Sequence, residues 1–219
     1  LGEKRLAVGP RDHPDDIGTH VRDPKVLEHD GVFYMVLGAR TKDDRGCVLV
    51  YTSHDLECWK YATRIELGEK FGFMWECPDL FELDGELVLV CCPQGVPAEG
   101  WRYRNPHQCV WFRIEADWDA PSFKIIEQGL PQMVDAGFDF YAPQSFEDAV
   151  GRRLMIGWVG CPDATAENPT VERGWQCALT VPRELSMRDG KLCQWPAREI
   201  EKLRSDGVRV AAGELVEDP

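Results

Sequence analysis

The sequence contains no apolar run of about 18 residues or more, the length that a membrane-spanning helix requires. It also has little positive charge: 25 Lys and Arg residues stand against 38 Asp and Glu residues, which gives a formal net charge of −13. Nucleic acids and anionic membranes are bound by basic surfaces. We therefore expect neither a nucleic-acid partner nor a membrane partner, although a local group of arginines suffices to bind a small anion.

Patterns that mark zinc sites, secretion and glycosylation are also missing. No Cys-x-x-Cys pair occurs, and no secretory signal is visible. Asn168-Pro169-Thr170 has proline in the middle position and is therefore not a glycosylation site. Nine cysteines at irregular spacing fit a reducing compartment. We expect free thiols, a cytoplasmic location, no metal and no organic cofactor.

Helical patterns are scarce, and the chain reads as short strands. Only residues 197–204 look helical, so a parallel sheet with crossover helices is excluded. Apolar runs flank Asp30-Gly31 and Asp84-Gly85, and both dipeptides favour the tight type I′ turn of a hairpin. The sequence predicts an all-β protein with a surface loop over most of residues 1–21. Further strands are expected at residues 6–8, 47–52, 109–114, 176–181 and 191–195.

One pattern occurs three times: a distinctive residue pair, a proline, an apolar run, a turn and a second apolar run. The copies begin at Arg22-Asp23-Pro24, Glu76-Cys77-Pro78 and Tyr141-Ala142-Pro143, so their prolines stand 54 and 65 residues apart. A period of about 50 residues with about four strands per unit is typical of β-propeller blades. Three blades cannot close a ring. We therefore expect the chain to supply about three blades of a larger propeller, or to have a partner.

Glu76 is the leading candidate for a chemical role. It stands between Trp75 and Cys77, two residues before Pro78 and the apolar run that follows. A glutamate with apolar neighbours is either paired or has a raised pKa, and a raised pKa suits a general acid near neutral pH. The alternative is a glutamate at the end of a strand that points to water.

Asp23 stands directly before the proline of the first copy, and Glu76 stands two residues before the proline of the second. The first strand of each blade lines the channel of a propeller, so Asp23 and Glu76 are expected to face each other across one pocket. Two carboxylates below aromatic rings are typical of sugar-cleaving enzymes, because the rings cover the C–H face of a sugar. The candidate rings are Trp75, Trp101, Tyr141 and Trp158.

Each of these residues also has a structural interpretation. Asp23 could cap a turn, and Arg22 could form a surface ion pair. Each tryptophan could pack in the core, and Cys77 is more typical of an inert buried thiol. His54 and His107 show no pattern that distinguishes them from ordinary loop histidines.

The motifs, taken in order, resemble glycoside hydrolase family 32, which comprises invertases, fructanases and sucrose-6-phosphate hydrolases. The Arg-Asp-Pro and Glu-Cys motifs together are specific, and the resemblance covers nearly the whole chain up to residue 204. The matching segments are residues 22–24, 75–78, 140–144 and 156–158, and residues 174–179 and 181–185 look like the family's final blade.

The resemblance implies a five-bladed propeller that cleaves terminal β-D-fructofuranosides with retention, through a covalent fructosyl-enzyme. It implies that Glu76 is the acid/base and that Asp23, assisted by Arg22, stabilises the oxocarbenium-like transition state. The other residues assigned to substrate binding are Trp75, Tyr141, Trp158 and Cys77, the last of which would tune the environment of Glu76.

The chain departs from the family pattern in its nucleophile. The family uses an aspartate in an Asn-Asp-Pro-Asn-Gly-like motif, whereas the Asn-Pro pairs at 105–106 and 168–169 lack the aspartate. We therefore expect residues 1–204 to be a partial propeller, roughly blades three to five, of a β-fructofuranosidase for sucrose or sucrose 6-phosphate. Residues 205–219 are expected to be a linker or the start of a β-sandwich. Without the nucleophile, the fragment is expected to be inactive.

Two other functions stay open at this point. One is a non-catalytic carbohydrate-binding or assembly module that kept the pocket and lost the nucleophile. The other is a related five-bladed glycosidase that acts on arabinan or xylan. Arg102 and Arg104 are candidates for binding a substrate phosphate, with solvated loop charges as the alternative.

Overall fold

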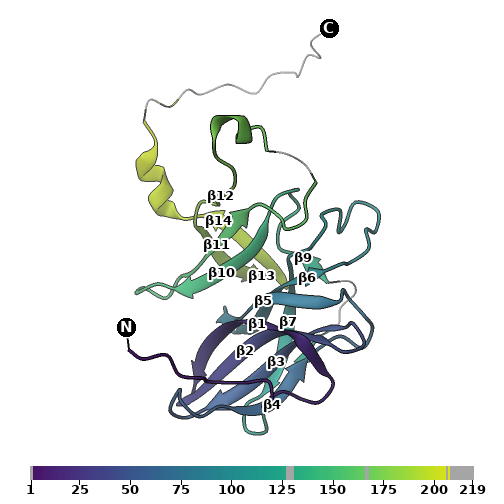
Figure 1. Ribbon diagram of the computed structural model, residues 1–219. Helices are drawn as coiled ribbons and strands as arrows, with labels where there is room; N and C mark the ends of the chain where they lie inside the picture. The colour runs from purple at the N-terminus through teal and green to yellow at the C-terminus, as the bar shows by residue number, and fades with distance from the viewer. Residues whose placement is uncertain (1, 127–130, 166–167, 206, 208–219) are drawn as a thin grey trace.

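A computed structural model describes residues 2–126, 131–165, 168–205 and 207. These residues form three antiparallel sheets in chain order (Figure 1). Figure 1 shows the first sheet at the bottom of the view and the third sheet at the top. Within each sheet the strands follow one another as a meander, which is the construction of a propeller blade. The prediction of an all-β chain with about three blades is confirmed.

The first sheet has the strand order β1-β2-β3-β4. Its first turn has φ values of 48° at Asp30 and 77° at Gly31, as a type I′ hairpin requires. The strand predicted at residues 6–8 is absent from the described structure, and Leu6 is 83% exposed, because this short stub pairs with no other strand. The strands are β1 (Ile17–His29), β2 (Val32–Thr41), β3 (Gly46–Ser53) and β4 (Lys60–Ile65).

The second sheet lies between the other two. Its strand β6 is buried on both faces because alternate side chains point to opposite neighbours. Leu89 and Cys91 pack in the cluster shared with the first sheet, whereas Val90 and Cys92 pack in the cluster shared with the third. The strands are β5 (Met74–Leu83), β6 (Glu86–Gln94), β7 (Val110–Asp117), β8 (Ser122–Ile125) and β9 (Gln132–Met133).

The third sheet departs most from the predicted strands. The strand expected at residues 176–181 is only the two-residue β12, and a longer strand at Arg183–Arg188 had no clear signal in the sequence. The predicted helix at residues 197–204 is a 3-10 helix, η2 (Arg198–Leu203); a second, η1, spans Val171–Arg173. The strands are β10 (Tyr141–Glu147), β11 (Arg153–Val159), β12 (Ala178–Leu179), β13 (Arg183–Arg188) and β14 (Lys191–Pro196).

The first strand of every sheet carries the same irregularity. The pairing of β1, β5 and β10 with the next strand shifts directly after Arg22, Glu76 and Tyr141. Each of these residues is followed by one with left-handed backbone and then by a proline, which fits a bulge because proline has no N–H to pair. The left-handed residues are Asp23 (φ 62°), Cys77 (48°) and Ala142 (48°).

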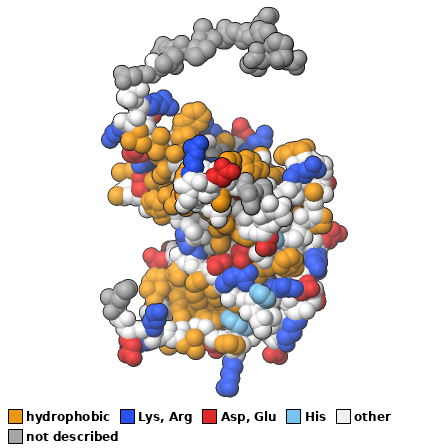
Figure 2. All heavy atoms as spheres, turned by 45° about the horizontal axis from the view of Figure 1, so that its top comes forward, with side chains coloured by type: hydrophobic (Ala, Val, Ile, Leu, Met, Phe, Trp, Pro, Cys, Tyr) orange, Lys and Arg blue, Asp and Glu red, His pale blue; other side chains and the backbone are white. Residues whose placement is uncertain are grey.

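The surface of the third sheet is markedly apolar. Phe146, Leu179, Val181 and Trp195 are between 48% and 75% exposed. Figure 2 shows hydrophobic side chains gathered on this part of the molecule and charged side chains across the middle. Exposed large hydrophobic residues that gather on one face are typical of a contact surface. In the described part of the chain, no helix has the length and apolar character to cross a membrane.

Candidate active site

Three side chains from the three first strands meet where the bulges lie. Arg22 on β1 donates from Nε to Glu76 Oε1 at 2.7 Å, and its Nη2 forms an ion pair with the same oxygen at 2.6 Å. Tyr141 on β10 donates from Oη to Glu76 Oε2 at 2.6 Å. Gln94, at the end of β6, donates to the same oxygen at 2.8 Å. The Glu76 side chain is 15% exposed, so its carboxylate is held by partners on three strands and still reaches the surface.

Asp23 lies against the strand that carries Glu76. Its Oδ2 accepts a hydrogen bond from the Cys77 backbone N–H at 3.0 Å and lies 3.6 Å from Cys77 Sγ. The bulge makes this possible, because it takes the Cys77 N–H out of the ladder with β6. The two carboxylates are therefore brought to the same end of neighbouring strands.

The matching of positions differs from the prediction, however. Asp23 was taken as the counterpart of Glu76, whereas the residues that precede the bulges are Arg22, Glu76 and Tyr141. Asp23 is instead the counterpart of Cys77, its own hydrogen-bond partner. The reason is that equivalent positions in the three strands are set by the bulge, whose left-handed residue directly precedes the proline. The position of the acidic residue does not set them.

Hydrogen bonding and burial keep two neighbouring groups in their protonated forms. A hydrogen bond with Cys92, together with burial, raises the pKa of the Cys77 thiol well above its usual range. Burial also raises the pKa of the Tyr141 hydroxyl, and the nearby Cys92 and Glu76 raise it further. A neutral thiol is a poor nucleophile, and a protonated phenol remains a hydrogen-bond donor to Glu76.

The tryptophans divide into three cases. Trp158 lies opposite Tyr141 in the β10–β11 pairing and is half-buried, packed against the core shared by the second and third sheets. Trp101 is 70% exposed in the loop after β6 and contacts Arg102. Trp75 is completely buried, stacks on Phe112 and donates from Nε1 to the Phe71 carbonyl at 2.7 Å. The assignment of Trp75 to substrate binding is therefore wrong, because strand alternation turns its ring into the core.

The sequence did not reveal several polar neighbours of the site. Gln94 bonds Glu76 directly, and His20 Nδ1 lies 3.1 Å from Arg22 Nη1. His107 is buried in the loop after β6, and its Nε2 lies 2.8 Å from Asp163 Oδ2 on the third sheet's loop. His20 stands two residues before Arg22, but the other two copies have Met74 and Asp139 at that place, so the alignment of repeats gave no signal for it.

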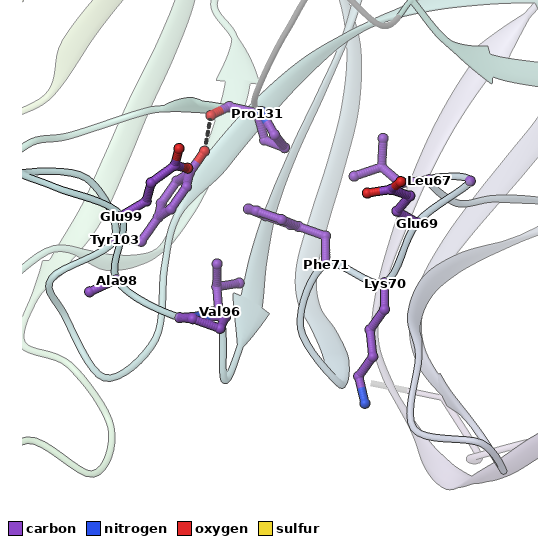
Figure 3. Close-up of a pocket in the computed structure, with 11 residues that line it drawn as sticks. Leu67, Glu69, Lys70, Phe71, Val96, Ala98, Glu99, Tyr103 and Pro131 are labelled. Atoms are coloured by element: carbon purple, nitrogen blue, oxygen red, sulfur yellow. Dashed lines mark hydrogen bonds between the residues drawn. The ribbon is translucent and has the colours of Figure 1, made fainter.

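A mostly apolar pocket of about 570 Å³ lies apart from these residues. Figure 3 shows its lining, in which the Phe71 and Tyr103 rings pack edge to face with centroids 5.4 Å apart and the Tyr103 hydroxyl is bonded to the Pro131 carbonyl. Neither Glu76 nor Asp23 lines it. Arg102 and Arg104 do not line it either; Arg104 donates to the Gly100 carbonyl within its own loop.

The arrangement suits general acid/base chemistry on a polar ligand. Glu76 is fixed in orientation by Arg22, Gln94 and Tyr141, and a fixed carboxyl group can exchange a proton with a ligand at a defined position. Asp23 offers a second carboxylate, which can accept hydrogen bonds from hydroxyl groups of a ligand. Within the described residues, no group of three or more His, Cys, Asp or Glu side chains is arranged to hold a metal ion.

Known proteins are similar in sequence to this chain over most of its length. Sucrose-6-phosphate hydrolases of Bacillus subtilis (strain 168) and Salmonella typhimurium are 39% and 42% identical to it. These alignments cover 90% and 88% of the chain, but the chain spans only 42% of each relative.

Solved structures agree with the sequence comparison. The sucrose-6-phosphate hydrolase of Lactobacillus gasseri superposes with a TM-score of 0.83 at 32% identity, over 94% of this chain and 42% of that one. The family 32 β-fructofuranosidase of Bombyx mori, solved as a variant with sucrose, gives a TM-score of 0.81 at 34% identity, over 90% and 41%. The predicted fold class is confirmed. Residues 4–196 match the Glycosyl hydrolases family 32 N-terminal domain, and the chain belongs to this family.

Proposed function

We propose that this chain is part of an enzyme that hydrolyses terminal β-D-fructofuranosides such as sucrose or sucrose 6-phosphate. The observation that carries the proposal is the set of contacts around Glu76, in which one carboxylate is held by Arg22, Gln94 and Tyr141 from three strands. The relatives named as sucrose-6-phosphate hydrolases support the same substrate class. The family match disfavours an enzyme for arabinan or xylan.

In the proposed reaction, Glu76 protonates the glycosidic oxygen of the leaving group and then removes a proton from water. Asp23 accepts hydrogen bonds from fructosyl hydroxyls, and the Cys77 N–H keeps its carboxylate beside the strand of Glu76. Trp158 and Tyr141 border the sugar. Retention of configuration requires a further carboxylate as nucleophile, and we place it outside this chain because no Asn-Asp-Pro motif occurs in it.

The same proposal includes the surroundings of the enzyme. Residues 1–204 would be a partial propeller whose apolar third sheet contacts the remaining blades or a partner. Most of the predicted linker at 205–219 lies outside the described residues. All nine cysteines are free, as a cytoplasmic enzyme would have them. Arg102, half-buried beside Trp101, remains the candidate for a substrate phosphate.

The test uses the product of the complete coding sequence and three variants. Glu76→Gln and Asp23→Asn should each lower kcat/KM for sucrose by roughly 100- to 10,000-fold. Glu115→Gln, at an exposed position on β7, is the matched control and should keep the parent's activity. Sucrose hydrolysis by Glu76→Gln within a few-fold of the parent would exclude Glu76 as the acid/base.

A second measurement separates the enzyme from a non-catalytic module. The isolated chain and the complete product are compared for sucrose hydrolysis and for sucrose binding by calorimetry. An enzyme fragment gives hydrolysis only with the complete product. Binding without hydrolysis in both forms would instead assign the chain to a carbohydrate-binding module.

A further inference from the structure

A second layer of polar residues lies below the candidate site. The residue that follows the bulge proline in each first strand is polar: Lys25 on β1, Asp79 on β5 and Gln144 on β10. Lys25 Nζ donates to the Ser145 carbonyl at 2.6 Å and to Gln144 Oε1 at 3.1 Å, and it lies 3.5 Å from Asp79 Oδ1. One ammonium group therefore joins all three first strands.

Asp79 makes this contact necessary. Its side chain is 1% exposed, and its Oδ2 accepts a hydrogen bond from the Ser145 backbone N–H at 2.6 Å. Its other oxygen, Oδ1, is buried and has no hydrogen-bond partner in the described structure. The salt bridge with Lys25 is made to this oxygen. A buried carboxylate is strongly unfavourable unless a positive charge compensates it. Lys25 supplies that charge.

The layer lies close to the groups of the candidate site. Lys25 is two residues from Asp23, Asp79 is three from Glu76, and Gln144 is three from Tyr141. Between the two layers each strand passes through a residue with left-handed backbone, which costs free energy and persists only when the surroundings hold it. The contacts of Lys25 fix the strands just beyond these bulges.

We propose that Lys25 is a positioning residue of the candidate site. By pairing with Asp79 and bonding the β10 backbone, it sets how the three first strands lie relative to one another, and so where Asp23, Glu76 and Tyr141 stand. This inference rests on the proposed function for its kinetic test. It assigns to Lys25 no contact with substrate.

The kinetic test uses the complete product with Lys25→Met, Lys25→Arg, Asp79→Asn and the double variant Lys25→Met/Asp79→Asn. Displacement of reacting groups by about 1 Å lowers rates by roughly 100-fold, so Lys25→Met should lower kcat by about 10- to 100-fold per folded molecule. KM should change by less than about 3-fold, because the sugar-binding groups remain. Lys25→Arg should recover most of kcat. The double variant should have a higher kcat than Lys25→Met, because it no longer contains the buried carboxylate that Lys25→Met leaves unpaired.

Two controls keep the result interpretable. Lys124→Met, at an exposed position on β8, should match the parent. Circular dichroism and thermal unfolding give the folded fraction of each variant.

The inference is overturned if Lys25→Met keeps kcat per folded molecule within 2-fold of the parent, or if Lys25→Arg fails to recover activity while folded. If Lys25→Met does not fold, the comparison of Lys25→Arg with Asp79→Asn decides: Asp79→Asn should lower kcat and Lys25→Arg should not, and the reverse order overturns the inference.

Failure of the proposed function would show separately, because the parent itself would then release no fructose from sucrose. In that case a crystal structure of Lys25→Met or Asp79→Asn tests the inference. The Arg22–Glu76 and Tyr141–Glu76 contacts should be lengthened or lost. Both contacts unchanged would overturn the positioning role.

Discussion

Arg22 and Glu76 are 54 residues apart in the sequence, yet two nitrogens of the guanidinium group converge on one oxygen of the carboxylate, at 2.7 and 2.6 Å. Each residue directly precedes the bulge of its own first strand. The ion pair therefore joins two blades at the side chain proposed as the acid/base. The Arg22 side chain is 33% exposed and that of Glu76 is 15% exposed, so water screens the pair only in part.

Replacement of Arg22 by lysine should impair the enzyme even though the charge is kept. Lysine cannot present two donors in the planar geometry of a guanidinium group. Loss of a charge-assisted hydrogen bond costs about 1.5 to 3 kcal/mol, so kcat/KM for sucrose should fall roughly 10- to 100-fold in the complete product. Arg188→Lys, on the exposed end of β13, is the control. Equal kcat/KM for Arg22→Lys and the control would contradict a role for the paired geometry.

Replacement of Trp75 and of Trp101 by alanine should have very different effects on the free energy of unfolding. Trp75 is fully buried and stacked on Phe112, whereas Trp101 is 70% exposed. Trp75→Ala should lower the free energy of unfolding of the chain by about 3 to 5 kcal/mol. Trp101→Ala should change it by less than about 0.5 kcal/mol. Urea denaturation followed by circular dichroism measures both. Similar midpoints for the two variants would show that Trp75 is not a core residue.

The buried Tyr141 hydroxyl should make stability fall at alkaline pH. Its pKa is raised in the folded state, mainly by burial, while in the unfolded chain it is about 10. The folded protein therefore keeps a proton that the unfolded chain loses, and stability decreases as pH rises above about 10. Tyr141→Phe should reduce the difference between denaturation midpoints at about pH 8 and about pH 11. An unchanged difference would mean that Tyr141 titrates as an exposed phenol.

Arg152 should control the acid stability of the third sheet. It bonds Asp148 at the β10–β11 turn and Glu199 in η2, at 2.7 and 3.0 Å. A hydrogen bond from Arg152 lowers the pKa of Glu199 to about 2, and the Arg152 backbone N–H lowers the pKa of Asp148. Carboxylates with depressed pKa values stabilise the fold above their ordinary pKa of about 4, and this stabilisation is lost as pH falls toward about 2.

The variant Arg152→Met tests this pairing. It should have a lower Tm than the parent chain at pH near 7, and the difference should shrink as pH falls toward about 2, where Glu199 begins to be protonated in the folded parent as well. Arg188→Met serves as the exposed control. A constant difference in Tm across this pH range would show that Arg152 acts by packing alone.

Short-range patterns explain which features the sequence predicted. The turns at Asp30-Gly31 and Asp84-Gly85 were foreseen because positive φ at two successive positions depends on those residues alone. The three-fold repeat was foreseen because each copy has its own proline and its own hairpin. Glu76, Asp23 and Arg22 stood out for the same reason, since each lies at a fixed place in a copy.

Contacts across strands explain what the sequence missed. Gln94 reaches Glu76 because a bulge shifts the β5–β6 register, and that shift cannot be counted from the turn at Asp84-Gly85. Trp75 is next to Glu76 in sequence, but adjacent residues in a strand point to opposite faces. The sequence did not show which of these two side chains, Trp75 or Glu76, points into the core.

The sequence by itself determined that the chain is all-β, that it repeats a hairpin unit three times and that two acidic residues stand one and two positions before the prolines of two copies. Only the tertiary structure decided that Arg22, and not Asp23, meets Glu76, and that Lys25 joins the three first strands. The physical reason is range. Turn and strand preferences act within a few residues, whereas these ion pairs depend on how bulged strands from separate sheets are packed against one another.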